Sequence, residues 1–195
     1  MLYVLRLFCL ALILSAPIGS AATAAADDKM NRAVDTTRVL LSQAHAALAR
    51  NGDSRALHQA IASAFAMKLW ERFLLQDRDR DFTAGQRREF RSLLTGYMAN
   101  LYMNQFDRGM YSAPTVGAAR KVRRDFLVAS RFKRGNGRDL PVEWRIREVP
   151  GSGAQVIDIM VGGTSFLILK REEFRAIIDK SGAEGLLTYM RRNAR

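Results

Sequence analysis

Hydrophobic residues recur at helical spacing through the first half of the chain. Apolar positions repeat every three or four residues over residues 30–50 and again over residues 54–74, a pattern typical of amphipathic helices. Thr83 and Gln86 have the spacing of a capping box, in which each side chain accepts a hydrogen bond from the other residue's backbone N–H. This pair predicts a long helix that continues to about residue 108.

The second half of the chain begins with the pattern of strands. Residues 121–132 mix β-branched, aromatic and basic residues, and a Gly-Asn-Gly turn signal at residues 135–137 precedes strict alternation of apolar and polar residues at 142–147. Residues 156–161 are apolar on both faces except at Asp158, which predicts an inner strand that is covered on both sides. We therefore expect three or more antiparallel strands.

Helical spacing returns at the end of the chain. It covers residues 165–180, and Gly182 stands where a glycine commonly ends a helix, before a last short helix at residues 183–192. Helices and strands thus occur in separate blocks, which favours an α+β fold with helices packed on one face of a curved antiparallel sheet of about four strands. Such a sheet can fill its interior with side chains or leave an apolar cavity, and periodicity alone does not decide between them.

The N-terminus has the composition of a secretory signal peptide. Arg6 gives a short positive segment, an apolar run follows at residues 7–15, and helix-breaking Pro and Gly residues lead into small residues that end at Ala26. The breakers interrupt the run of about 20 apolar residues that an uncleaved anchor would need. Residues 1–26 are therefore predicted to be a signal peptide, and residues 27–195 a single exported domain.

The chain is strongly basic, with a formal net charge of +12. Basic clusters would attract anionic lipid headgroups or an acidic protein partner, and an ordinary solvated surface is the alternative. Nucleic acid is not expected as a partner, because export removes the usual target. The densest clusters are Arg120, Lys121, Arg123 and Arg124; Arg131, Lys133, Arg134 and Arg138; and Arg191, Arg192 and Arg195.

Residues that carry chemistry are sparse, and no metal or other cofactor is predicted. His45 and His58 lie on separate helical segments without a carboxylate or cysteine at ligand spacing, and the acidic run at residues 77–81 has Arg at alternate positions. The single cysteine, Cys9, lies in the predicted signal peptide. Asp158 needs hydrogen-bond donors within its apolar strand, and we expect it to bind a neighbouring backbone amide or Arg rather than to act in catalysis.

The C-terminal half carries a series of motifs in a characteristic order. They are an alternating strand, a strand that ends in Asp, a Gly-x-Ser element, a helix with an aromatic residue, and a Gly-x-x-Gly-Leu turn, at residues 142–146, 156–158, 163–165, 171–174 and 182–186. With a weaker match over residues 70–90, this series resembles the MlaC-type family, also called toluene-tolerance proteins. Members of that family are periplasmic carriers of phospholipid between the two membranes of Gram-negative bacteria.

The resemblance implies a periplasmic carrier rather than an enzyme. Its expected partners are an inner-membrane lipid ABC transporter with a ring of substrate-binding subunits and an outer-membrane lipoprotein–porin complex, and its expected role is to maintain the lipid asymmetry of the outer membrane. In the family, acyl chains lie between sheet and helices while the headgroup stays near the surface. The apolar positions of this chain that would line such a cavity, each with an ordinary core position as the alternative, are Phe65, Leu69, Tyr97, Leu101, Val128, Trp144, Ile146, Ile157, Ile159, Phe166 and Phe174.

Two other interpretations stay open at this point. Some family members are associated with hopanoid production, so a rigid polycyclic lipid could replace the phospholipid as cargo. An enzyme of the ketosteroid-isomerase-like type would use one buried Asp as a base, and Asp158 is the candidate for that role. The sequence shows no obvious Tyr or acidic partner for Asp158 on the adjacent strands.

Overall fold

A computed structural model describes residues 19–50, 53–106, 112–133, 137 and 139–194. Helices occupy the first half of the chain, as expected, and strands with one further helix occupy the second. The helices are α1 (Gly19–Ala49), α2 (Ser54–Ala64), α3 (Met67–Leu75), α4 (Ala84–Phe106) and α5 (Phe166–Asn193), with a 3-10 helix, η1 (Gln76–Asp81), between α3 and α4. The strands are β1 (Thr115–Val122), β2 (Asp125–Lys133), β3 (Asp139–Val149), β4 (Gly153–Val161) and β5 (Thr164–Ser165).

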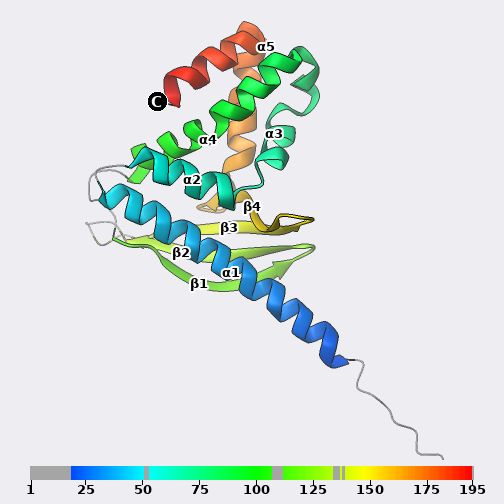
Figure 1. Cartoon of the computed structure of the whole chain (residues 1–195), viewed down its shortest axis with the longest axis vertical. Coiled ribbons are helices and arrows are strands. Elements are labelled where there is room, and N and C mark those ends of the chain that lie inside the picture. The colour runs from blue at the N-terminus through cyan, green and yellow to red at the C-terminus, as the bar shows by residue number, and fades with distance from the viewer. Residues whose placement is uncertain (1–18, 51–52, 107–111, 134–136, 138, 195) are drawn as a thin grey trace, which may run out of the picture.

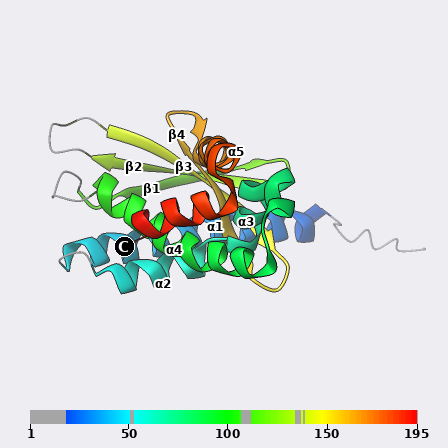
Figure 2. The same cartoon turned by 90° about the horizontal axis from the view of Figure 1, so that it is seen from above.

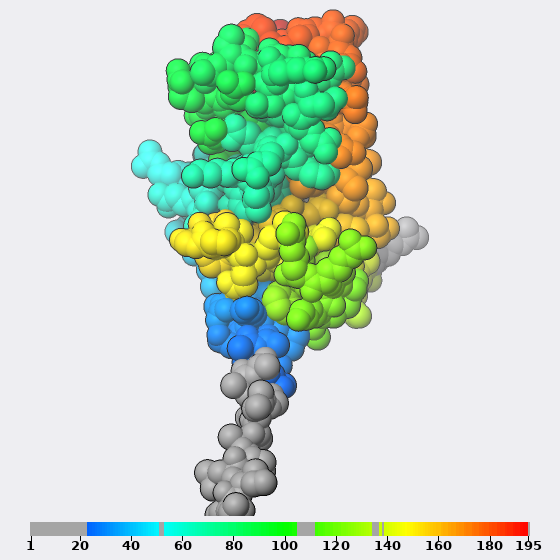
Figure 3. All heavy atoms as spheres, turned by 90° about the vertical axis from the view of Figure 1, so that its right-hand side faces the viewer, coloured from blue at the N-terminus to red at the C-terminus, as the bar shows by residue number. Residues whose placement is uncertain are grey.

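The strands form one antiparallel sheet in chain order, β1-β2-β3-β4-β5, which confirms the predicted α+β class (Figure 1). The stretch at residues 121–132 contains a hairpin turn that its composition does not signal, because β1 ends at Val122 and β2 begins at Asp125. Arg123 takes the left-handed conformation at this turn, with φ of 56°, a position where Gly or Asn is more usual. The tips of the β1–β2 and β3–β4 hairpins lie side by side on the face of the molecule that Figure 3 shows.

Helix α1 crosses the sheet and contacts all four long strands. Helix α4 instead packs on α2, α3 and α5, and α3, α4 and α5 extend beyond the β4 edge in Figure 1. Seen from above, α2 and α4 lie on one side of the strands (Figure 2). The capping box at the start of α4 is present: the Thr83 N–H donates to Gln86 Oε1 at 3.0 Å, and the Gln86 N–H donates to Thr83 Oγ1 at 3.2 Å.

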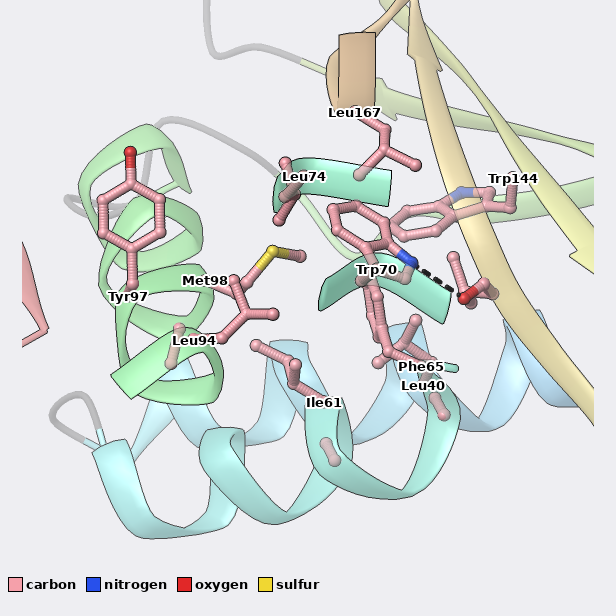
Figure 4. Close-up of a cluster of buried hydrophobic side chains, with 14 of the residues drawn as sticks. Leu40, Ile61, Phe65, Trp70, Leu74, Leu94, Tyr97, Met98, Trp144 and Leu167 are labelled. Atoms are coloured by element: carbon pink, nitrogen blue, oxygen red, sulfur yellow. Dashed lines mark hydrogen bonds between the residues drawn. The ribbon is translucent and has the colours of Figure 1, made fainter. Parts of the chain in front are cut away.

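The helical stripe at residues 54–74 is interrupted where it meets β4. Phe65 and Ala66 separate α2 from α3, and the Ala66 N–H donates to the Val156 carbonyl at 3.0 Å. The indole Nε1 of Trp70 donates to the same carbonyl at 3.1 Å, as the dashed line in Figure 4 shows. Strand β4 thus fixes the position of the helix break and of the Trp70 side chain. The spacing of apolar residues along a helix does not by itself reveal either of these contacts.

Asp158 joins β4 to the start of α5, as expected for a structural role. Its Oδ1 accepts from the backbone N–H groups of Ile159 and Leu167 at 2.7 and 3.1 Å, and its Oδ2 accepts from the Ser165 hydroxyl at 2.6 Å. Ser165 Oγ in turn caps α5 by accepting from the Ile168 N–H at 3.1 Å. These bonds determine where α5 begins relative to the end of β4.

The last helix bends at Gly182, where the sequence predicts a helix end. Gly182 has φ of 67° and ψ of −175°, a conformation that only glycine adopts without strain. The two halves of α5 on either side of this bend correspond to the two C-terminal helices expected from the sequence.

A buried carboxylate is held by two arginines on the sheet face that points away from the helices. The Asp125 side chain is fully buried, and it accepts from Arg145 Nε at 2.7 Å and from Arg147 Nε and Nη2 at 2.6 and 2.9 Å. Burial favours the protonated acid, but the hydrogen bonds from Arg147 and Arg145 outweigh it and hold the pKa of Asp125 below its ordinary value. The three side chains tie β2 to β3.

We predict that Asp125→Asn lowers the free energy of unfolding by about 2 kcal/mol at neutral pH, because the hydrogen bonds of both arginines to a carboxylate are weakened. A depressed folded-state pKa stabilises the protein above the unfolded-state value near 3.9 and loses that contribution as the pH falls through the folded-state pKa. Urea unfolding at a series of pH values should therefore show the variant and wild type converging in acid. Asp139→Asn, at an exposed carboxylate on β3, is the control; a deficit for Asp125→Asn that is independent of pH would contradict the prediction.

Candidate functional site

An apolar cavity of about 490 Å³ lies between the sheet and the helices. This volume is within the range of about 300–1,000 Å³ that is typical of small-molecule sites. The cavity occupies the end of the sheet where β2 leads to β3 and β4 leads to β5. Its walls are formed by Leu40, Ala44, Leu57, Ile61, Phe65, Met98, Leu101, Tyr102, Phe132, Leu140, Val142, Trp144, Ile159, Val161, Phe166 and Lys170.

Strand pairing explains which sheet residues reach the cavity. Val142 and Trp144 are alternate residues of β3 and point to the same face, and across the ladder they stand opposite Val161 and Ile159 of β4. Phe132 of β2 adds to the same face at the same end. The floor of the cavity is therefore one end of a single sheet face.

Helices supply the other walls, and α4 stands off from the sheet. Leu40 and Ala44 come from α1, and Ile61 comes from α2. Met98 and Leu101 reach in from α4, which is held by neighbouring helices rather than by the strands. The distance between α4 and the sheet is what leaves the cavity open.

Trp144 forms a fixed wall of the cavity. Its indole Nε1 donates to Ser130 Oγ at 2.8 Å, and the Ser130 hydroxyl donates to the Val142 carbonyl at 3.0 Å. Both side chains are buried, so these bonds satisfy polar groups that would otherwise be costly inside the protein. The aromatic surface of Trp144 is thereby left to face the cavity.

The cavity reaches the surface near the turn between β4 and α5. Gly162, Gly163 and Thr164 are exposed, and they separate two lining residues, Val161 and Phe166. Val161 is itself 38% exposed. The lining residues Leu57, Ile61 and Phe65 are buried. We call the segment from Val161 to Lys170 the rim.

The cavity carries little polarity. Lys170, at the rim, is the one charged side chain among its lining residues in the described part of the chain. Burial raises the pKa of Tyr102, so its hydroxyl remains neutral at physiological pH. The surface offered to a ligand is therefore apolar and aromatic, with a cation at one end.

Five of the predicted lining residues lie together in this cavity: Phe65, Leu101, Trp144, Ile159 and Phe166. The other six lie elsewhere. Tyr97 and Phe174 pack on each other between α4 and α5, with ring centroids 5.5 Å apart. Figure 4 shows Tyr97 directed away from Phe65 and Trp70, whereas the next residue, Met98, points toward them.

The remaining residues are distributed over the core. Val128 and Ile146 are on the same sheet face as Trp144 but are fully buried beyond the cavity, and Ile157 lies at an irregularity in the pairing of β3 with β4. Leu69 is partly buried on α3. Lipid contact remains a prediction for all eleven residues.

Several lining residues were not identified from the sequence. The predicted apolar helix faces include Leu40, Ala44 and Ile61. The helical spacing of apolar residues identifies such a face but does not indicate which turn of the helix borders a cavity. The alternation of apolar and polar residues indicates that Phe132 and Val142 lie in strands, but it does not indicate that they line a cavity. Lys170 has no signal at all, because a lysine near the start of a helix is an ordinary surface residue.

Asp158 is the candidate base of the enzyme interpretation. Asp158 does not line the cavity, and both of its oxygens accept hydrogen bonds from β4 and the start of α5. Within the described ranges, His, Cys, Asp and Glu side chains form no group of three or more that would hold a metal ion. Nor does any helix in those ranges combine the length and hydropathy required to cross a membrane.

The architecture is that of an α+β protein in which an antiparallel sheet and a helical layer enclose an apolar cavity. A model of the MlaC protein family matches residues 17–192, and the chain therefore belongs to the MlaC family. The fold is also similar to the solved structure of a phospholipid-binding protein from Ralstonia solanacearum in complex with a phospholipid, with a TM-score of 0.67 and 16% identity. That match covers 83% of this chain and 96% of the other. No curated protein matches the sequence.

The two tryptophans provide a test of the cavity. Trp144 lines it and Trp70 does not, so a lipid with a spin-label quencher on its acyl chain should quench Trp144 in a Trp70→Phe protein by at least about half at saturation. Trp144→Phe, which retains Trp70 behind the lining residues Phe65 and Phe166, is the matched control and should be quenched less. Equal quenching of the two variants, measured by steady-state fluorescence, would mean that the ligand does not occupy this cavity.

Proposed function

We propose that this protein is a periplasmic carrier that holds a phospholipid by its acyl chain and shuttles it between the inner and outer membranes. The observation that carries this proposal is the apolar cavity between α4 and the sheet. Transfer of each methylene group from water into such a site is favourable by about 0.8 kcal/mol, so a long acyl chain supplies ample binding energy without any catalytic group.

The distribution of polarity in the cavity suits an amphiphile. The buried lining residues Leu57, Ile61 and Phe65 match an acyl chain, while the rim, from Val161 to Lys170, includes exposed residues and a charged group. A ligand with an apolar tail and a polar head would place each part in a compatible environment. Apolar contacts would recover the dispersion energy that an empty cavity forfeits.

The N-terminal sequence supports a periplasmic location. Residues 1–26 have the three regions of a signal peptide, of which residues 1–18 lie outside the described part of the chain. Membership of the MlaC family favours the same compartment. In this proposal the signal peptide is removed and residues 27–195 act as a single domain.

The proposed role of the basic surface is docking to membrane complexes. We define this surface as the exposed basic residues of β1, β2 and the turn that joins them, which are Arg120, Lys121, Arg123, Arg124, Arg131 and Lys133. β1 is an edge strand, where such charges also prevent pairing with another sheet. Arg134 and Arg138 lie outside the described residues. In the C-terminal cluster, Arg191 is already paired with Glu89 and Glu184, each at 2.7 Å, and Arg195 is not described.

The proposed partners are an inner-membrane lipid ABC transporter with a substrate-binding ring and an outer-membrane lipoprotein–porin complex. Together with them the carrier would maintain the lipid asymmetry of the outer membrane. The chain would provide transport by binding and release, and energy for directional transfer would come from the transporter.

Filling the cavity should abolish lipid uptake while preserving the fold. Ala44 lines the cavity from α1, so Ala44→Trp places an indole where an acyl chain would lie and should reduce phospholipid extraction from vesicles at least about tenfold. Extraction is measured by separating protein from vesicles that contain a radiolabelled phospholipid. Ala62→Trp makes the same change at an exposed position of α2 and should extract lipid like the wild type.

Leu101→Glu is a second cavity variant, which introduces a carboxylate into the apolar wall and should reduce extraction for a different physical reason. Circular dichroism and urea unfolding establish that each variant is folded. Normal extraction by both folded variants would contradict the proposal that this cavity holds the lipid.

A further inference from the structure

Lys170 occupies an unusual place for a lysine. Its side chain is only 17% exposed and lines an otherwise apolar cavity. Nζ lies 5.6 Å from the ring centroid of Phe166 and 5.8 Å from that of Tyr97. An ammonium group so placed gives up much of its hydration, and an aliphatic residue would pack there at lower cost.

The ammonium is held in position by a short chain of hydrogen bonds. Lys170 Nζ donates to Glu173 Oε2 at 2.6 Å, and the Tyr189 hydroxyl donates to Glu173 Oε1 at 2.5 Å. Burial opposes ionisation of Glu173, but the hydrogen bonds from Lys170 and Tyr189 hold the pKa of its carboxyl below the ordinary value. Glu173 is therefore a carboxylate at neutral pH, and its hydrogen bond orients the Lys170 ammonium.

The Lys170 ammonium retains donors for a ligand. It has three N–H groups, and the bond to Glu173 uses one of them. Phe166 is one turn earlier on α5, and both residues line the cavity where it approaches the exposed turn at 162–164. A lipid whose acyl chain occupies the buried part of the cavity would bring its headgroup close to Lys170.

We propose that Lys170 is the headgroup subsite of this cavity and that it binds the phosphate of the lipid. Glu173 and Tyr189 act as positioning residues that orient the ammonium. This inference rests on the proposed function, because it assigns the part of the ligand that the apolar walls leave unbound. It deepens that function by naming the lipid group that is recognised: lipids with a phosphate at the glycerol bind more tightly than neutral lipids with the same acyl chains.

The test compares Lys170→Met with wild type on two lipids that share their acyl chains, phosphatidylglycerol and diacylglycerol. Lys170→Met keeps a long apolar stem and removes the charge. We expect the dissociation constant for phosphatidylglycerol to rise about tenfold while that for diacylglycerol is unchanged. Lys170→Arg should retain the preference for phosphatidylglycerol, and Lys180→Met, at an exposed position of the same helix, should bind both lipids like the wild type.

Three results separate the possibilities. Unchanged binding of phosphatidylglycerol by folded Lys170→Met overturns the subsite, although the carrier function stands if wild type binds both lipids. Equal loss of both lipids also overturns it, because Lys170 would then only support the shape of the cavity. If wild type binds neither lipid, the proposed function itself fails, and the subsite fails with it.

Discussion

The attachment of the helices to strand β4 determines the architecture of this protein. Two groups of hydrogen bonds make the attachment: the Val156 carbonyl accepts from the Ala66 backbone and the Trp70 indole, and the Asp158 carboxylate accepts from residues at the start of α5. In the described ranges, helix α4 makes no such hydrogen bond to a strand and packs instead on α2, α3 and α5. The helical layer is thus fixed at β4, and a cavity remains between α4 and the neighbouring end of the sheet.

This arrangement separates stability from ligand binding. The end of the sheet face around Phe126, Val128, Ile146 and Val156 is buried and packed, so it contributes to folding whether or not a ligand is present. The other end, around Val142, Trp144 and Ile159, keeps its apolar surface available. The proposed carrier function requires both parts, because a carrier must remain folded after it has released its cargo.

Much of the fold follows from the sequence, because amphipathic periods and caps are local signals. The α+β class, the capping box at Thr83 and Gln86 and the bend at Gly182 all have such signals. The break at Phe65 and Ala66 has none, since it arises from hydrogen bonding to Val156, which is distant in the chain. The turn between β1 and β2 was also missed, because an arginine takes the position that glycine usually occupies.

The residues that line the cavity are harder to predict from the sequence than the fold is. Alternation correctly placed Val142, Trp144 and Ile146 on one sheet face, yet Ile146 does not line the cavity, because the helices fill one end of that face and not the other. Neighbouring residues on α4 differ in the same way, with Met98 in the wall and Tyr97 packed against α5. Sequence periodicity identifies buried faces, whereas a cavity depends on where packing between distant elements is incomplete.

The most direct test of the central claim is native mass spectrometry of the wild-type protein, purified from a bacterial periplasm without detergent, followed by extraction of the bound material. For a phospholipid carrier, we expect a discrete added mass that corresponds to a phospholipid. A polycyclic lipid in its place would retain the cavity as a carrier site but contradict the assignment of the cargo. Protein that is empty as purified, and that stays empty after incubation with phospholipid vesicles, would rule out the proposed carrier function.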